Sequence, residues 1–106
     1  PEAIEEIHNF VEEMPQFKGD IMLFLSKNIR YPSLAQELGI QGKVICQFVV
    51  DRNGAIENVE VVRGIDKSLD NEAVRVIKSM PNWKPGRMNG RTVKVKYTLP
   101  IYFRLM

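Results

Sequence analysis

The sequence predicts an α+β domain in which a three-stranded mixed sheet carries its helices on one face. The periodicity of the apolar residues gives the element order helix, helix, strand, strand, helix, strand. The length of 106 residues suits one compact domain and is too short for two ordinary ones. Hydrophobic residues make up 44% of the chain and charged residues 26%, values near the globular average, which argue against whole-chain disorder and against a fibrous repeat.

The first 19 residues are predicted to be a leader, the end of a linker, and residues 20–106 to be the folded domain. The leader forms either a short helix or an extended arm, because its apolar residues have helical spacing but Pro15 and Gly19 end that pattern. These apolar residues are Ile4, Ile7, Phe10, Val11 and Met14.

Two short helices are predicted to follow the leader. Asp20 suits the N-cap of a helix over about 21–29, which has one apolar stripe. Pro32 suits the first position of a second helix, and Gly39 suits the position that ends it.

A hairpin is predicted next. Residues 43–51 are apolar on both faces, which is typical of a central strand. The run Asp51-Arg52-Asn53-Gly54 is a strong turn signal. The strand that follows, about 55–63, is more polar and is expected at a sheet edge that its charges protect.

A third helix is predicted over about 67–80, where the apolar residues fall on a single face. Either Asp66 or Ser68 is its N-cap, and Pro81 ends it. Trp83 is expected to close the core beneath a compact loop.

The longest predicted element is a strand over 91–105, which a turn at Asn89-Gly90 precedes. Its odd-numbered residues from Val93 are apolar, and its polar residues lie on the other face. A helical crossover returns a parallel strand, so this strand is expected to pair antiparallel with the central one. The spatial order across the sheet is then 55–63, 43–51 and 91–105, so strand 91–105 lies at a free edge.

Pro100 supports this placement, because proline has no N–H and is tolerated where no ladder bond is needed. If even-numbered residues direct their backbone groups outward, Pro100 removes no bond from the sheet. The free groups are then expected at Lys94, Lys96, Thr98, Tyr102 and Arg104. With about 3.3 Å per residue, the strand should also extend past its shorter partner.

A long exposed edge is a template for pairing with another chain. The residues alone leave open what pairs with this edge. It could be a peptide from a partner, it could be the leader or a neighbouring molecule, or it could be a second copy in a swapped or edge-to-edge homodimer.

The inventory of reactive residues disfavours an enzyme. One histidine, His8, and one cysteine, Cys46, cannot build a catalytic triad or a zinc site, and no phosphate-binding glycine motif is present. We therefore expect no catalytic residues, no metal and no cofactor. The net charge of +2 argues against nucleic acid as a partner, which would use the sheet face.

No apolar run approaches the ~20 residues that span a bilayer. The chain begins at Pro1 without a methionine, so we expect an excised fragment, with a membrane anchor in the part that precedes it.

The order and spacing of several short motifs resemble the C-terminal domain of TonB energy transducers, from about residue 14 to residue 105. The motifs are Tyr31-Pro32, Gly42-x-Val44, Asp51-x-x-Gly54-x-Ile56-x-x-Val59-x-Val61, Leu69-Asp70-x-x-Ala73 and Trp83-Lys84-Pro85-Gly86. The leader run Met14-Pro15-Gln16-Phe17-Lys18-Gly19 is similar to that of Bacteroidetes-type members.

The resemblance implies a periplasmic domain of an inner-membrane-anchored transducer. Such a domain binds the N-terminal TonB-box peptide of outer-membrane receptors by adding it as a strand, and passes on proton-motive energy for active uptake. Its anchor would meet proton-channel proteins of the inner membrane.

By position, the resemblance implies that the pairing strand runs through Lys94–Arg104 and that a second contact region precedes Tyr31-Pro32. That region here reads Asn28-Ile29-Arg30, whereas well-studied members have a Gln/Pro-rich stretch. The same domain also ends other membrane proteins, including beta-lactam-sensor-like metallopeptidases, where it would be a sensor or interaction domain.

Overall fold

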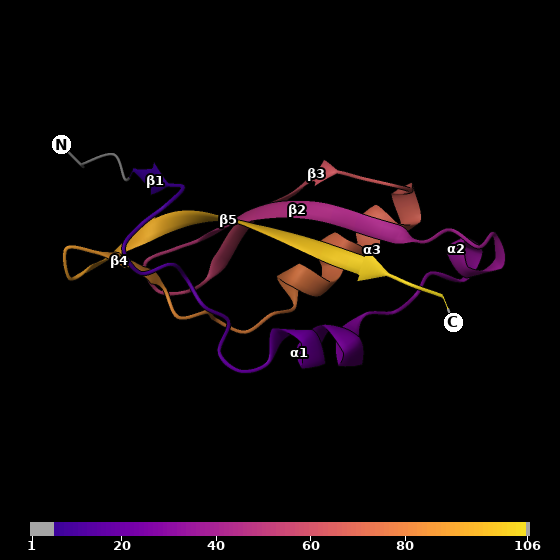
Figure 1. Cartoon of the computed structure of the whole chain (residues 1–106), viewed down its shortest axis with the longest axis horizontal. Coiled ribbons are helices and arrows are strands. Elements are labelled where there is room, and N and C mark those ends of the chain that lie inside the picture. The colour runs from indigo at the N-terminus through magenta and orange to yellow at the C-terminus, as the bar shows by residue number, and fades with distance from the viewer. Residues whose placement is uncertain (1–5, 106) are drawn as a thin grey trace.

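One long, twisted sheet organises the chain, in a computed structural model that describes residues 6–105 (Figure 1). Strand β2 (Gly42–Val50) lies between β3 (Ile56–Arg63) and β5 (Arg91–Phe103), and it pairs antiparallel with both. The α+β class and the predicted order of the three long strands are confirmed. β5 extends beyond the end of β2, as expected, because the pairs between them begin only at Val95.

The prediction of three strands needs a correction, since the described residues contain two more. Strand β1 (Ile7–His8) pairs parallel with β5 on the side away from β2, and β4 (Gly86–Met88) forms a hairpin with the start of β5. The hairpin turns at Asn89 and Gly90, whose φ angles of 53° and 75° are those of a type I′ turn. The sequence predicted that turn but assigned the residues before it to a loop.

The turn between β2 and β3 forms as its residues predict. The Asp51 carboxylate accepts bonds from the N–H groups of Asn53 and Ala55, at 2.8 and 2.9 Å, and the Gly54 N–H donates to the Asp51 carbonyl. These bonds hold an aspartate-centred turn that fixes the hairpin.

The described residues also form three helices: α1 (Ile21–Asn28), α2 (Ser33–Glu37) and α3 (Lys67–Lys78). The Asp20 side chain caps α1, as predicted, and Asp66 rather than Ser68 caps α3. Pro32 was predicted as the first residue of α2 but is its N-cap, and the helix begins at Ser33.

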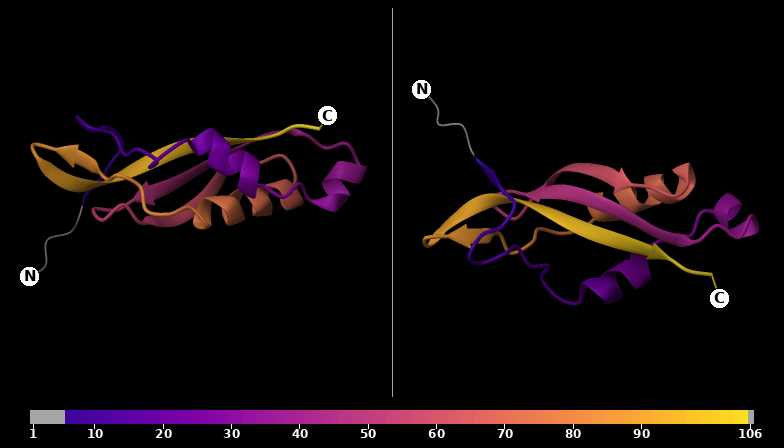
Figure 2. Two further views of the ribbon diagram at one scale, coloured as in Figure 1. Left: turned by 90° about the horizontal axis from the view of Figure 1, so that it is seen from below. Right: turned by 45° about the horizontal axis from the view of Figure 1, so that its top comes forward.

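The core lies between α3 and one face of the sheet, and α1 lies alongside β5 (Figure 2). The apolar face of α3 packs against even-numbered residues of β2, of which Val44, Cys46 and Phe48 are fully buried. Trp83 is 1% exposed and contacts Phe48 and Phe17, so it closes the core as expected.

The described part of the leader is an extended arm and contains no helix. Glu13 and Arg87 exchange two backbone hydrogen bonds, at 3.1 and 2.8 Å, and Gln16 and Lys84 exchange two more, at 3.0 and 2.8 Å. These bonds attach the arm to β4 and to the residues before it. Ile4, part of the predicted helical pattern, and Met106 lie outside the described residues.

Candidate functional site

The outer edge of β5 has the backbone pattern that the sequence predicted. Pro100 lies opposite Ile45 of β2, and it has no N–H with which to form a ladder bond. Antiparallel pairs alternate between hydrogen-bonded and non-bonded positions, so Ile45 and Pro100 form a non-bonded pair. It follows that odd-numbered residues of β5 bond to β2, whereas even-numbered residues direct their N–H and C=O groups away from it.

The other pairings of β5 agree with this alternation. The β4 hairpin has a two-residue turn, so Met88 and Arg91 next to it form a bonded pair and β4 lies on the same side of β5 as β2. Strand β1 meets β5 at Lys94, an even-numbered residue, on the opposite side. The outer edge is therefore shared only with β1 among the described elements.

β1 changes where the open edge begins. Ile7 pairs with Lys94, and His8 pairs with Val95, so the leader covers the first of the predicted edge residues. The Lys94 ammonium also contacts Glu57 at 2.9 Å, across the outer face of the sheet. The leader, one of the occupants that the sequence left open, thus covers the start of this edge.

Beyond β1, the edge runs toward the carboxyl end of β5. Thr98 and Tyr102 are exposed, and Lys96 is half-buried. Arg104 lies just past the last residue of β5, and its guanidinium is 5.4 Å from the centre of the Tyr102 ring, within the range of a cation–π contact. The structure thus places four predicted residues along one edge, with Arg104 past its end.

The predicted second contact region lies near the end of this edge. The Tyr31 ring packs edge-on against Phe103, the last residue of β5, with 5.7 Å between ring centres, and the Tyr31 hydroxyl donates to the Ile40 carbonyl. Pro32 is half-buried beside it. Tyr31 therefore links this region directly to β5.

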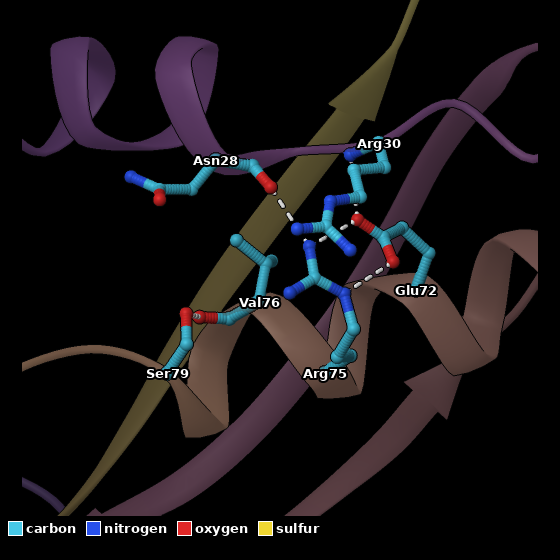
Figure 3. A network of polar contacts seen from close by, with 6 residues as sticks. All are labelled: Asn28, Arg30, Glu72, Arg75, Val76 and Ser79. Carbon is cyan, nitrogen blue, oxygen red and sulfur yellow. Dashed lines mark hydrogen bonds and ion pairs between the residues drawn. The ribbon is translucent and has the colours of Figure 1, made fainter.

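The residues before Tyr31 bond to α3 instead (Figure 3). The Asn28 carbonyl accepts a bond of 2.7 Å from Arg75, and the Arg30 N–H donates to the Glu72 carboxylate at 2.6 Å. Ile29 is half-buried and joins the core. The backbone at Asn28 and Arg30 is thus held by the helix rather than turned to the edge.

Glu72 is the centre of this contact, and sequence reasoning missed it. Its carboxylate is 9% exposed and receives two bonds from the Arg75 guanidinium, at 2.6 and 2.7 Å. Burial opposes its ionisation, but the bonds from Arg75 and from the Arg30 N–H outweigh burial and hold the pKa of Glu72 below its usual value. The sequence shows only a glutamate and an arginine three positions apart on a helix, a spacing common on exposed faces.

The described residues offer little for covalent or metal chemistry. No three side chains among His, Cys, Asp and Glu gather there as metal ligands, and no described helix is long and apolar enough to cross a membrane. Burial, and then the charge of Asp70, raise the pKa of the Cys46 thiol to about 11. Cys46 is fully buried and is therefore an inert core residue.

Similarity to known proteins shows the family of this domain. The model of the Gram-negative bacterial TonB protein C-terminal family matches residues 27–105. The chain therefore belongs to the family of TonB C-terminal domains.

Protein TonB of Helicobacter pylori is 31% identical over 91 residues, which cover 85% of this chain and 31% of that protein. Protein TonB of Pseudomonas aeruginosa is 25% identical over 75 residues, which cover 71% of this chain and 22% of that protein. This chain therefore spans less than a third of the length of these curated relatives.

The solution structure of the C-terminal domain of H. pylori TonB superposes with a TM-score of 0.63 at 27% identity, and the match covers 81% of this chain and 78% of that one. A second solution structure of that domain gives a TM-score of 0.58 at 28% identity, over 79% of this chain and 88% of that one.

Proposed function

We propose that this domain binds an extended peptide as an added strand along the outer edge of β5, and that the peptide is the TonB box of an outer-membrane receptor. The observation that carries the proposal is the pairing of Pro100 with Ile45. It leaves the backbone groups of Thr98 and Tyr102 directed away from β2, at the edge of the sheet opposite to β3.

Main-chain hydrogen bonds would supply most of the affinity in this mode, and side chains would add modest selection. A peptide strand beside β5 would meet the side chains of Lys96, Thr98 and Tyr102 on the outer face of the sheet. At the end of β5 it would come near Arg104 and the region of Tyr31 and Pro32, with Asn28, Ile29 and Arg30 behind them.

The membership of the TonB C-terminal family supports the wider role. In that role the domain lies in the periplasm, at the end of a protein anchored in the inner membrane, and acts by binding rather than catalysis. Proton-channel proteins of the inner membrane would act on the anchor, outside the present chain, and the domain would pass the energy on to uptake by the receptor.

A titration with a synthetic receptor-box peptide, followed by NMR of the backbone amides, tests the proposal. The largest shifts are expected at residues 96–104, with smaller ones at 28–32. Shifts confined to β3 and α3 would place the peptide elsewhere and overturn the proposal.

A matched pair of variants tests the mode of binding. Thr98→Pro removes one outward N–H and is expected to weaken binding about tenfold, since one hydrogen bond contributes about 1 kcal/mol and the ring also obstructs the edge. Thr98→Ala keeps the N–H and removes only the side chain, so it should bind nearly as well as the wild type. Equal affinity of the proline and alanine variants would contradict strand addition at this edge.

A further inference from the structure

We propose that the leader around β1 is an internal strand that a bound peptide must displace from the β5 edge. This inference rests on the proposed function of that edge and concerns its regulation. It predicts that the leader lowers the affinity of the domain for the peptide. The size of this effect depends on how stably residues 7–10 are bound to the edge of β5.

The register of β1 places it on the groups that a peptide would use. In a parallel pair, every second residue of a strand bonds to the two residues that flank its partner on the other strand. His8 is the partner of Val95, so it is placed to donate to the Lys94 carbonyl and to accept from the Lys96 N–H. β1 therefore occupies two of the even-numbered residues that direct their groups outward.

The leader also stands over the next part of the edge. After β1 it borders a hollow of about 460 Å³ beside residues 96–98 of β5. The hollow is lined by Asn9, Phe10, Met14, Gln47, Lys96, Tyr97 and Thr98. A peptide strand that reached Lys96 from Thr98 would enter this space and meet the leader.

The attachment of β1 is weak compared with the attachment of the rest of the leader. β1 has two residues, Ile7 is 44% exposed, and Phe10 beyond it is 85% exposed. By contrast, Glu13 and Gln16 each exchange two backbone bonds with residues near β4, and Glu13 also forms an ion pair with Arg87. Residues 7–10 can therefore leave the edge while the leader stays anchored at 13–16.

Because this anchor lies a few residues away, the detached strand would remain at a high effective concentration near its site, on the order of mM. A strand held so weakly by its own contacts can then still compete with a peptide in solution. The apparent association constant of the peptide is then its intrinsic value multiplied by the fraction of molecules whose edge is open.

Two substitutions at one position test the backbone contact. His8→Pro removes the N–H that faces Lys94, and His8→Ala keeps it while removing the same side chain. We expect His8→Pro to bind the receptor-box peptide at least threefold more tightly than the wild type, and His8→Ala to bind within twofold of it. Without peptide, the Lys96 amide should exchange hydrogen faster in His8→Pro than in His8→Ala.

A reversible cross-link tests whether peptide binding weakens when β1 cannot leave the edge. Ile7 and Lys94 are direct partners, so the double variant Ile7→Cys with Lys94→Cys has neighbouring thiols that can form a disulfide. An added oxidant takes up the two electrons, and the two thiols release two protons. The oxidised protein should bind the peptide at least tenfold more weakly than the same protein after reduction.

The outcomes separate the two proposals. Peptide binding at residues 96–104 that is unchanged by His8→Pro and by the disulfide would overturn this inference and leave the proposed function standing. No binding at that edge in any of these proteins would overturn both.

Discussion

The backbone N–H of Arg30 donates to a carboxylate oxygen of Glu72, 42 positions away in the sequence, at 2.6 Å. The same carboxylate binds the Arg75 guanidinium, which also donates to the Asn28 carbonyl (Figure 3). One buried acid therefore fixes the chain between α1 and α2 to α3. That chain leads into Tyr31 and the end of β5, so the shape of the candidate site depends on Glu72.

Replacement of Glu72 should reduce stability. Glu72→Ala leaves the Arg30 N–H and part of the Arg75 guanidinium without partners, and we expect the free energy of unfolding to fall by about 1–3 kcal/mol. Urea unfolding at neutral pH measures this loss. Glu37→Gln, at an exposed glutamate, is the control and should change stability by less than about 0.5 kcal/mol.

Glu72 should also make stability depend on pH. Its folded pKa lies below its unfolded value of 4.5, so its contribution is fully present above that value and is lost as pH falls through the folded pKa. Glu72→Gln cannot ionise, so its stability should fall less steeply below about pH 4.5 than that of the wild type. Parallel acid curves for the two proteins would contradict this assignment.

Gly54 should tolerate no side chain. Its φ is +87°, and a Cβ placed there would lie 1.9 Å from the Trp83 carbonyl oxygen. We expect Gly54→Ala to lower the free energy of unfolding by about 2–4 kcal/mol, from the left-handed backbone and the overlap together. Gly39→Ala is the matched control, because Gly39 also has a positive φ, +68°, but nothing within 4 Å, and it should cost about 1 kcal/mol.

The alternation along β5 can be measured without a ligand. The amides of Leu99 and Ile101 bond to β2 and should exchange hydrogen slowly, whereas those of Thr98 and Tyr102 face outward and should exchange at least tenfold faster. Pro100→Ala adds an amide that should exchange as fast as its even-numbered neighbours. Slow exchange at Thr98 and Tyr102 in the monomer would show that another segment covers the edge.

Cys46 should react only when the protein unfolds. It is fully buried, and with a thiol pKa of about 11 only about one molecule in a thousand carries a thiolate at pH 8. A disulfide-forming reagent should label the denatured chain at once and the native chain only at its rate of opening. Rapid labelling of the native protein would show an opening that the core packing does not allow.

The long elements of this fold follow from the sequence because each carries its own signal. The doubly apolar run of β2, the single apolar face of α3 and the alternation of β5 each indicate their element without knowledge of the rest. Pro100 then indicates which edge of β5 is unpaired. The predicted outward positions within β5 agree with the register, and β1 covers the first of them, Lys94.

The short strands could not be predicted in the same way. β1 has two residues and β4 has three, too few for an alternation to be recognised, and both form because β5 offers them an edge. The leader has helical spacing from Ile7 to Met14, yet its backbone bonds to β4 and β5 hold it extended. The Glu72 contact was hidden for a similar reason, since its partner Arg30 comes from a distant segment.

The leader's attachments lie in sequence along the chain, and this order determines how the domain would respond to tension. A force that pulls on the chain before Ile7 loads β1 first, then the bonds of Glu13 with Arg87, then those of Gln16 with Lys84. Each attachment would bear the whole load alone and rupture before the next is strained. The arm would thus lengthen in steps, and the paired core of β2 and β5 would be loaded last.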